Sequence, residues 1–142
     1  MPRFRKASWI ILALVAVLVI AGSVASAYNA YIAHAYTIGP ARVGEVAAGR
    51  ADVETALHGI RGTAAAFAAA YGAMLLSVVL GPYRRGETWC WWAILIAAVV
   101  LFVFAAARQP FLGTTLGIGT PAIQLGLVLL ALVLDGGRLK AA

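Results

Sequence analysis

Four long apolar runs alternate with more polar segments along the chain, and each run is bounded by charged residues or by Pro and Gly. The hydrocarbon core of a bilayer is about 30 Å thick and requires about 20 apolar residues per helix. The pattern therefore predicts an all-α membrane protein, one domain over residues 1–142, with four transmembrane helices packed as a bundle. The predicted helices cover residues 9–27, 59–80, 89–107 and 114–134.

The fourth run is less regular than the other three. Thr120 is a suitable N-cap and Pro121 suits the first helical position, but a helix from there to Leu134 spans only about 21 Å. Two arrangements remain open: the helix begins near Thr114 and is kinked at Pro121, or a short re-entrant piece precedes a half-helix. We expect the kink, because neighbouring helices can satisfy the carbonyls that a proline leaves free.

The segment between the first two predicted spans, residues 28–58, is too long for a tight turn. It divides at Gly39 and Pro40, and its first part is expected to continue the first helix or to lie along the membrane interface. The second part repeats apolar residues with a helical period, which predicts an amphipathic helix with a break near Gly49. Together they predict a small helical cap at the outer ends of the spans. The tyrosines expected to form an aromatic belt there are Tyr28, Tyr31 and Tyr36.

Composition agrees with a membrane protein. Of the 142 residues, 63% are apolar and 11% are charged, against about 25% charged in a typical soluble domain. The net charge of +6 does not indicate nucleic acid, because the basic residues lie in small groups beside the apolar runs. The single cysteine, Cys90, excludes an internal disulfide, and no Cys or His pair has the spacing of a zinc site. We therefore expect no metal and no nucleic-acid partner.

The basic residues also predict the orientation, since Lys and Arg stay preferentially on the cytoplasmic side of a membrane. Alternating sides places seven on the side of the termini, Arg3, Arg5, Lys6, Arg84, Arg85, Arg138 and Lys140, and four on the other, Arg42, Arg50, Arg61 and Arg108. Both termini are therefore predicted in the cytoplasm, in a multi-pass protein of a bacterial-type inner membrane.

The first apolar run has a second interpretation. Basic residues precede it, and Ala25, Ser26 and Ala27 imitate the cleavage site of a signal peptide. We favour a retained helix, because the apolar run is long for a signal sequence.

The segment "GPYRRGETWCWW", residues 81–92, joins the second and third predicted spans on the predicted cytoplasmic side. Gly81 and Pro82 are predicted to end the second helix. The arginines suit the anionic headgroup region, and the aromatic rings suit the membrane interface, where they fix the depth of the third helix. The predicted interface anchors are Tyr83, Arg84, Arg85, Trp89, Trp91 and Trp92.

The run from Arg85 to Trp92 resembles the "R-x-G-x-x-W-x-W-W" turn of small bacterial four-helix membrane proteins, including domains of unknown function and DoxX-like proteins. The resemblance covers the second and third predicted spans with their turn, and Cys90 stands where an alanine is expected. It implies a four-helix inner-membrane protein, but no activity and no site residues.

A group of polar residues precedes the second span. The members that share one helical face are Arg50, Glu54, His58 and Arg61. One hypothesis is a polar site at the outer entrance, in which His58 acts as acid, base or ligand, Glu54 orients it and Arg61 holds an anionic group. The alternative is a ladder of solvated i,i+4 pairs, each contributing about 0.2–0.5 kcal/mol.

His34 is the other histidine of the chain. With His58 it is a candidate for bis-histidine haem ligation on the outer side, although no spacing rule brings the two segments together. The alternative is an interfacial histidine that lies beside tyrosines.

Small residues mark the second span and permit close helix packing. The predicted packing residues are Gly62, Ala66, Ala70 and Gly72. No ionisable residue lies at mid-depth in any span, which disfavours coupled transport. We therefore expect a non-catalytic accessory or assembly subunit without a cofactor, which contacts lipids and a larger membrane complex or another copy of itself. The alternative is a binder or modifier of a lipid, quinone or haem, whose polar end lies at Glu54, His58, Arg61 and His34.

Overall fold

The computed structural model describes residues 3–140, and 84% of the structure is helical. The elements, in chain order, are α1 (Arg3–Tyr28), η1 (Asn29–Ala33), β1 (Thr37–Ile38), β2 (Ala41–Arg42), α2 (Val43–Ala47), α3 (Ala51–Val78), η2 (Val79–Tyr83), α4 (Thr88–Ala106), α5 (Arg108–Leu112), α6 (Gly119–Leu134) and η3 (Gly136–Lys140). The η1 and η2 segments are π-helical, and η3 is a 3₁₀ helix. The chain divides into two compact units, which are Val17–Ala73 and Met1–Ala16 with Met74–Ala142.

Within the part of the chain that the structure describes, three helices are long and apolar enough to cross a membrane. They are Phe4–Ala33, Ala51–Tyr83 and Thr88–Leu112. α6 is also apolar, but its 16 residues form only about 24 Å of helix, which is less than the thickness of the hydrocarbon core. Large apolar side chains are exposed along these helices, as lipid-facing surfaces require.

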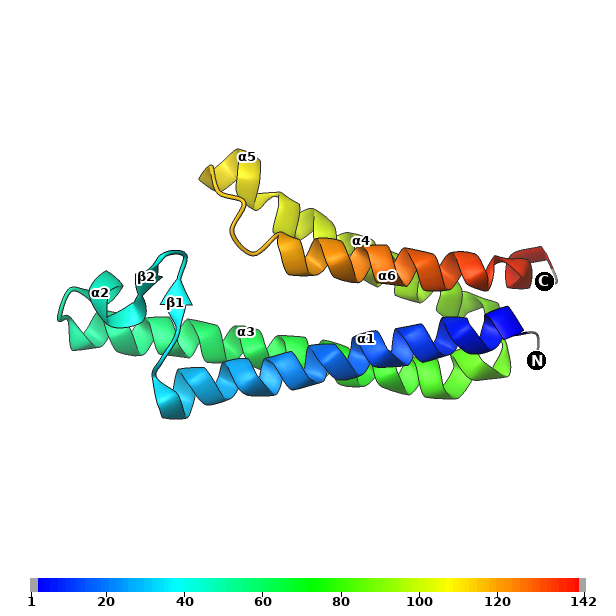
Figure 1. Ribbon diagram of the computed structural model, residues 1–142, viewed down its shortest axis with the longest axis horizontal. Coiled ribbons are helices and arrows are strands. Elements are labelled where there is room, and N and C mark those ends of the chain that lie inside the picture. Colours follow the sequence, from blue (N-terminus) through cyan, green and yellow to red (C-terminus); the bar gives the residue numbers. More distant parts are fainter. Residues whose placement is uncertain (1–2, 141–142) are drawn as a thin grey trace. The chain divides into compact units, whose positions relative to one another are not determined.

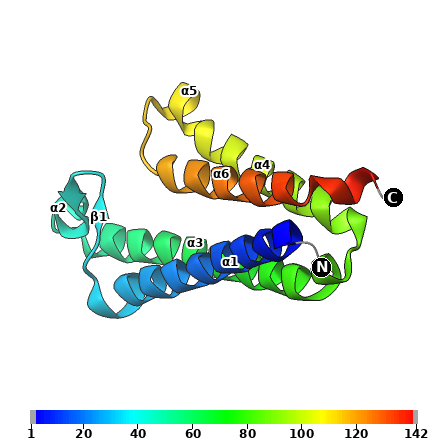
Figure 2. The same cartoon turned by 45° about the vertical axis from the view of Figure 1, so that its right-hand side comes forward.

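In the unit Val17–Ala73, the second half of α1 and the first part of α3 lie side by side and run in opposite directions (Figure 1, Figure 2). The phenol of Tyr31, at the end of the first helix, lies against Gly62, where a Cβ atom would overlap it. A glycine at this position therefore lets the tyrosine ring reach the backbone of α3.

A short β-hairpin, which the sequence analysis did not predict, follows η1. β1 pairs antiparallel with β2, with Thr37 opposite Arg42, and Gly39 takes a positive φ of 61° at the turn. The amide of Val43 donates to the carbonyl of Tyr36 at 3.2 Å and closes the hairpin. Two-residue strands carry too little alternation to be recognised in a sequence.

The predicted helical cap over residues 28–58 differs from the observed structure. α2 ends where Ala48 and Gly49 adopt positive φ values of 50° and 78°, so the predicted break near Gly49 is confirmed. However, α3 begins directly after this break and continues without interruption, so residues 51–58 are the first turns of the long helix and not a separate cap. Glycines inside α3 do not end it, because the helix is rich in alanine, which has the highest helix propensity.

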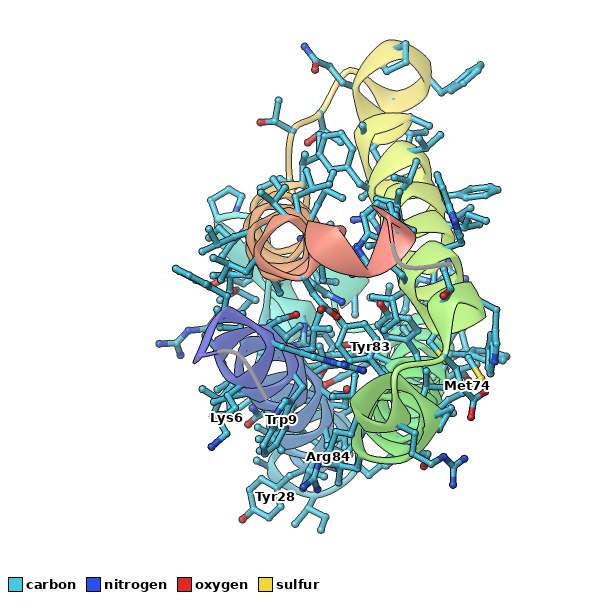
Figure 3. The ribbon with its side chains drawn as sticks, turned by 90° about the vertical axis from the view of Figure 1, so that its right-hand side faces the viewer. Lys6, Trp9, Tyr28, Met74, Tyr83 and Arg84 are labelled. Atoms are coloured by element: carbon cyan, nitrogen blue, oxygen red, sulfur yellow. The ribbon has the colours of Figure 1, made fainter. Side chains whose placement is uncertain are left out.

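In the other unit, α4 packs along α6 (Figure 1). The indole N–H of Trp91 donates to the carbonyl of Leu132, one of the last carbonyls of α6, at 3.0 Å. The hydroxyl of Ser8 in α1 lies 2.7 Å from that of Tyr83, and both side chains are fully buried. Figure 3 shows Tyr83 directed inward between the helices, whereas Lys6 points outward.

The predicted end of the second span at Gly81 and Pro82 is wrong. The chain stays helical through both residues as η2, and a π-turn accommodates the missing N–H of Pro82. The helix ends at Gly86, which has a positive φ of 102° and whose amide donates to the carbonyls of Pro82 and Tyr83, each at 3.1 Å. Glycine in this position is a common C-cap.

The predicted start of the fourth span near Thr114 is also wrong. The short helix α5 ends at Gly113, and α6 begins only at Gly119. Gly113 and Gly117 have positive φ values of 65° and 81°, which prevent one continuous, kinked helix. α5 continues the third long helix, Thr88–Leu112, and residues 113–118 form a loop before α6, so the re-entrant piece of the other arrangement is not observed either.

Candidate functional site

His34 and His58 come from different elements and meet in the unit Val17–Ala73. His34 follows η1 with a φ of 51° and a ψ of 22°, a left-handed conformation that ends the helix. His58 lies near the start of α3 and is only 7% exposed. The Nδ1 atom of His34 is 3.2 Å from the Nε2 atom of His58, and the rings meet edge to face with their centroids 4.5 Å apart. The structure thus brings together two residues from separate segments of the sequence.

Tyr36 joins the histidine pair, although the sequence analysis assigned it only to an aromatic belt. Its ring packs edge to face against His58, with the centroids 5.3 Å apart. The guanidinium of Arg61 lies 4.3 Å from the centroid of the Tyr36 ring, in a cation–π contact. The sequence feature that could have indicated this contact is the position of Tyr36, two residues after His34.

Glu54 lies four residues before His58 on α3, and its Oε1 atom is 3.6 Å from the Nε2 atom of His58. Arg50, which was expected on the same face, precedes α3 and pairs instead with Asp52 at 2.9 Å. We call the five residues that meet here the polar cluster, which consists of His34, Tyr36, Glu54, His58 and Arg61.

Three buried polar atoms of the polar cluster have no hydrogen-bond partner among the described residues. They are the hydroxyl of Tyr36, Nδ1 of His58 and Nε of Arg61. A buried polar atom without a partner costs about 1–3 kcal/mol, and most such atoms in folded proteins are satisfied. The three atoms belong to side chains that contact one another.

An open hollow of about 620 Å³ adjoins the polar cluster. His34, Tyr36 and Glu54 line it from the polar cluster, and Arg42 and Glu45 line it from β2 and α2. Glu45 accepts a hydrogen bond from the backbone amide of Arg42 at 2.9 Å, which fixes this part of the rim.

Burial raises the pKa of the Tyr36 phenol above its ordinary value of 10.0, while the charge of Arg61 lowers it and that of Glu54 raises it further. Since the net direction is upward, the phenol stays protonated at neutral pH. It can therefore donate a hydrogen bond as well as accept one.

Bis-histidine haem ligation by His34 and His58 stays a prediction. The axial histidines of such a haem would have their ligating nitrogens about 4 Å apart, on opposite faces of the porphyrin. Here Nδ1 of His34 and Nε2 of His58 are 3.2 Å apart, so ligation would require the two rings to separate. Among residues 3–140, no group of three or more His, Cys, Asp or Glu side chains is placed to hold a metal ion.

The predicted interface anchors of the turn between η2 and α4 have different environments. Trp89 and Trp92 are about half exposed, at 54% and 50%. The guanidinium of Arg84 lies 4.5 Å from the ring centroid of Trp9 (Figure 3). The prediction that Tyr83 is an interface anchor is wrong. Its side chain is fully buried and hydrogen-bonded, so it does not face a membrane surface.

Comparisons with protein-family models, with curated proteins and with solved structures find no match for this chain. The resemblance of residues 85–92 to a turn of four-helix membrane proteins therefore stays a prediction. Any functional conclusion depends on the residues of the polar cluster.

Proposed function

We propose that the chain crosses a bacterial-type inner membrane four times, with both termini in the cytoplasm and the polar cluster near the outer surface. Three helices of sufficient length and the seven-to-four distribution of basic residues support this topology. α6 supplies the fourth crossing as a bundle helix, and local thinning of the bilayer offsets its short length.

Cysteine labelling in intact cells tests this topology. After Cys90→Ser, an impermeant maleimide should label Gly44→Cys in α2 and should not label Glu87→Cys in the turn before α4. Labelling of Glu87→Cys without labelling of Gly44→Cys would show the reverse orientation. Labelling of both would exclude the proposed topology, because the two positions would then lie on the same side of the membrane.

We propose that the polar cluster binds the polar head of a small amphipathic molecule that resides in the membrane, such as a lipid or a quinone. The observation that carries this proposal is the set of three buried atoms without partners, on Tyr36, His58 and Arg61. Oxygen atoms of a headgroup would satisfy them, and an apolar tail would lie along the exposed apolar side chains of α1 and α3. Of the three residues that carry these atoms, Tyr36 lines the adjoining hollow, which offers room for the head.

Native mass spectrometry of protein extracted gently from its own membrane tests the binding of such a molecule. The unaltered chain should retain a small-molecule mass that His58→Ala and Arg61→Ala lose. Thr55→Ala is the matched control, because Thr55 is exposed on the same helix and its hydroxyl donates to the Ala51 carbonyl at 2.8 Å, outside the polar cluster. Retention of the same mass by all variants would exclude the polar cluster as the binding site.

A second candidate function is that of a non-catalytic accessory subunit, and one observation on α3 favours it. Of the predicted packing residues, Gly62 and Gly72 are buried, whereas Ala66 and Ala70 are exposed. Small exposed residues one turn apart allow a helix of another chain to approach closely. Extraction in a mild detergent should then recover a stoichiometric partner that Ala66→Leu displaces, and a homogeneous monomer would contradict this function.

A further inference from the structure

Two atoms face the Nε2 atom of His58 and determine where its proton lies. They are Nδ1 of His34 at 3.2 Å and Oε1 of Glu54 at 3.6 Å. An ionised carboxylate only accepts hydrogen bonds, so a lone pair on Nε2 would face a second lone pair. The carboxylate favours the tautomer with the proton on Nε2 of His58, in which His34 Nδ1 is the acceptor, over the reverse tautomer, in which His34 Nδ1–H donates.

This tautomer determines what the other nitrogen of His58 can do. In neutral His58 the buried Nδ1 atom has no proton and can only accept a hydrogen bond. When His58 is protonated, Nδ1 becomes a donor, and the ring faces the negative charge of Glu54.

Protonation of His58 changes the net charge of the polar cluster and therefore the kind of ligand that the cluster prefers. On α3, Glu54 and Arg61 offset one another, and from the other side His34 and Tyr36 are uncharged. The further charged residues at the hollow, Arg42 and Glu45, also offset one another. The polar cluster is therefore neutral before protonation of His58 and carries one positive charge after it.

We infer that the polar cluster binds an anionic oxygen headgroup of the phosphodiester class and takes up one proton, on His58, when it does so. This inference rests on the proposed function and identifies its ligand class. The donors for the headgroup oxygens are Nδ1–H of protonated His58, Nε–H of Arg61 and the hydroxyl of Tyr36, which are the three atoms without partners. Charge-assisted hydrogen bonds from two cations favour an anion over a neutral carbonyl.

Isothermal titration calorimetry of the full chain in maltoside micelles tests the inference, with dihexanoyl phosphatidylglycerol as the lipid probe and sodium sulfate as the free anion. Neither probe titrates near neutral pH, so a proton taken up comes to the protein. Titration in two buffers that differ in ionisation enthalpy counts these protons. We expect lipid binding to take up protons and to tighten as the pH falls.

Variants separate the role of His58 from a structural one. His58→Gln should abolish proton uptake, whereas Thr55→Ala should leave it unchanged. Glu54→Gln keeps a hydrogen-bond acceptor but removes the charge that favours the protonated ring, so it should shift the pH profile of binding to lower pH. A change in the pH profile is not expected from a residue that only holds the fold.

The possible outcomes distinguish failure of the inference from failure of the proposed function. Lipid binding without proton uptake, or with the same uptake in His58→Gln, would overturn the inference and leave the proposed function standing. Absence of binding by both probes would also overturn it, while a retained mass in native spectrometry would still support a membrane-resident ligand. Equal affinity for sulfate and lipid, with one proton taken up, would support the anion site and identify a free anion as its source.

Discussion

The Nδ1 atom of His34 lies 3.2 Å from the Nε2 atom of His58, although 24 residues separate them in the chain. The contact ties the segment after η1 to α3, and the stacking of Arg61 on Tyr36 strengthens the same attachment. Because His34 has a positive φ of 51°, this attachment depends on its backbone conformation as well as on its ring.

Removal of the His34 ring should loosen the β-hairpin. His34→Ala loses the hydrogen bond and leaves alanine in a left-handed conformation, which together cost about 1 kcal/mol or more. We expect the hairpin amides, including that of Val43, to exchange about fivefold faster in hydrogen–deuterium exchange mass spectrometry. His34→Asn is the control, since asparagine tolerates this conformation and its side chain accepts hydrogen bonds. Equal exchange in the two variants would contradict the role of the contact.

Two glycines of α3 should respond differently to alanine. Gly59 has open space where a Cβ atom would lie, so Gly59→Ala should raise the free energy of unfolding by up to about 1 kcal/mol through helix propensity. Gly62→Ala gains the same propensity but displaces the ring of Tyr31, so its net effect should be lower by about 1 kcal/mol. Unfolding by SDS in mixed micelles, followed by circular dichroism, measures both.

The same pair of variants can be checked in a second background. In Tyr31→Ala the displaced ring is absent, so Gly62→Ala should stabilise α3 as much as Gly59→Ala does. If the difference between the two glycines persists in that background, the contact between Tyr31 and Gly62 is not its cause.

Alkaline pH should destabilise the chain through Tyr36. Its pKa is higher in the folded state than the ordinary 10.0, so above about pH 10 the unfolded state loses the proton first. The unfolded state then binds fewer protons, and the free energy of unfolding falls as the pH rises. Tyr36→Phe should show a smaller fall between about pH 9 and 11 in the same SDS assay. An identical pH dependence in both proteins would contradict the upward shift.

Part of the polar cluster was predictable, because the face on which a helical residue lies follows from its spacing to nearby residues in the sequence. Glu54, His58 and Arg61 were placed on one face from their spacing alone, and the structure has them on one helix. The approach of His34 and Tyr36 was not predictable, since it depends on the left-handed conformation of His34 and on a hairpin of two-residue strands. Neither feature has a repeating pattern in the sequence.

The helix ends show a similar division. The break near Gly49 was predicted, because a glycine interrupts the apolar period there. At Pro82 the standard rule failed, because the π-turn tolerates the proline and the C-cap role falls to Gly86. The fourth helix was predicted to be kinked at Pro121, because membrane helices tolerate proline. The positive φ values of Gly113 and Gly117 instead place a break before that helix.

Ser8 and Tyr83 should behave as one buried pair. Their hydroxyls are 2.7 Å apart and both side chains are fully buried, so Tyr83→Phe or Ser8→Ala alone leaves a polar group without this partner. Each single change should lower the free energy of unfolding by about 1–2 kcal/mol, and the double change should cost less than the sum. A double-mutant cycle in the SDS assay measures the coupling, and strictly additive effects would contradict it.

The end of the second long helix should depend on Gly86. Its φ of 102° is unfavourable for a residue with a Cβ atom, and a Cβ atom there would also meet the guanidinium of Arg5. Gly86→Ala should therefore lower the free energy of unfolding by about 1–2 kcal/mol. Gly126→Ala in α6 is the control, because that position has open space and a helical backbone, so it should be neutral or stabilising. In an Arg5→Ala background the cost at Gly86 should fall but not vanish, since the backbone strain remains. A cost that disappears completely would show that the side-chain contact alone requires glycine and that the backbone conformation imposes no strain.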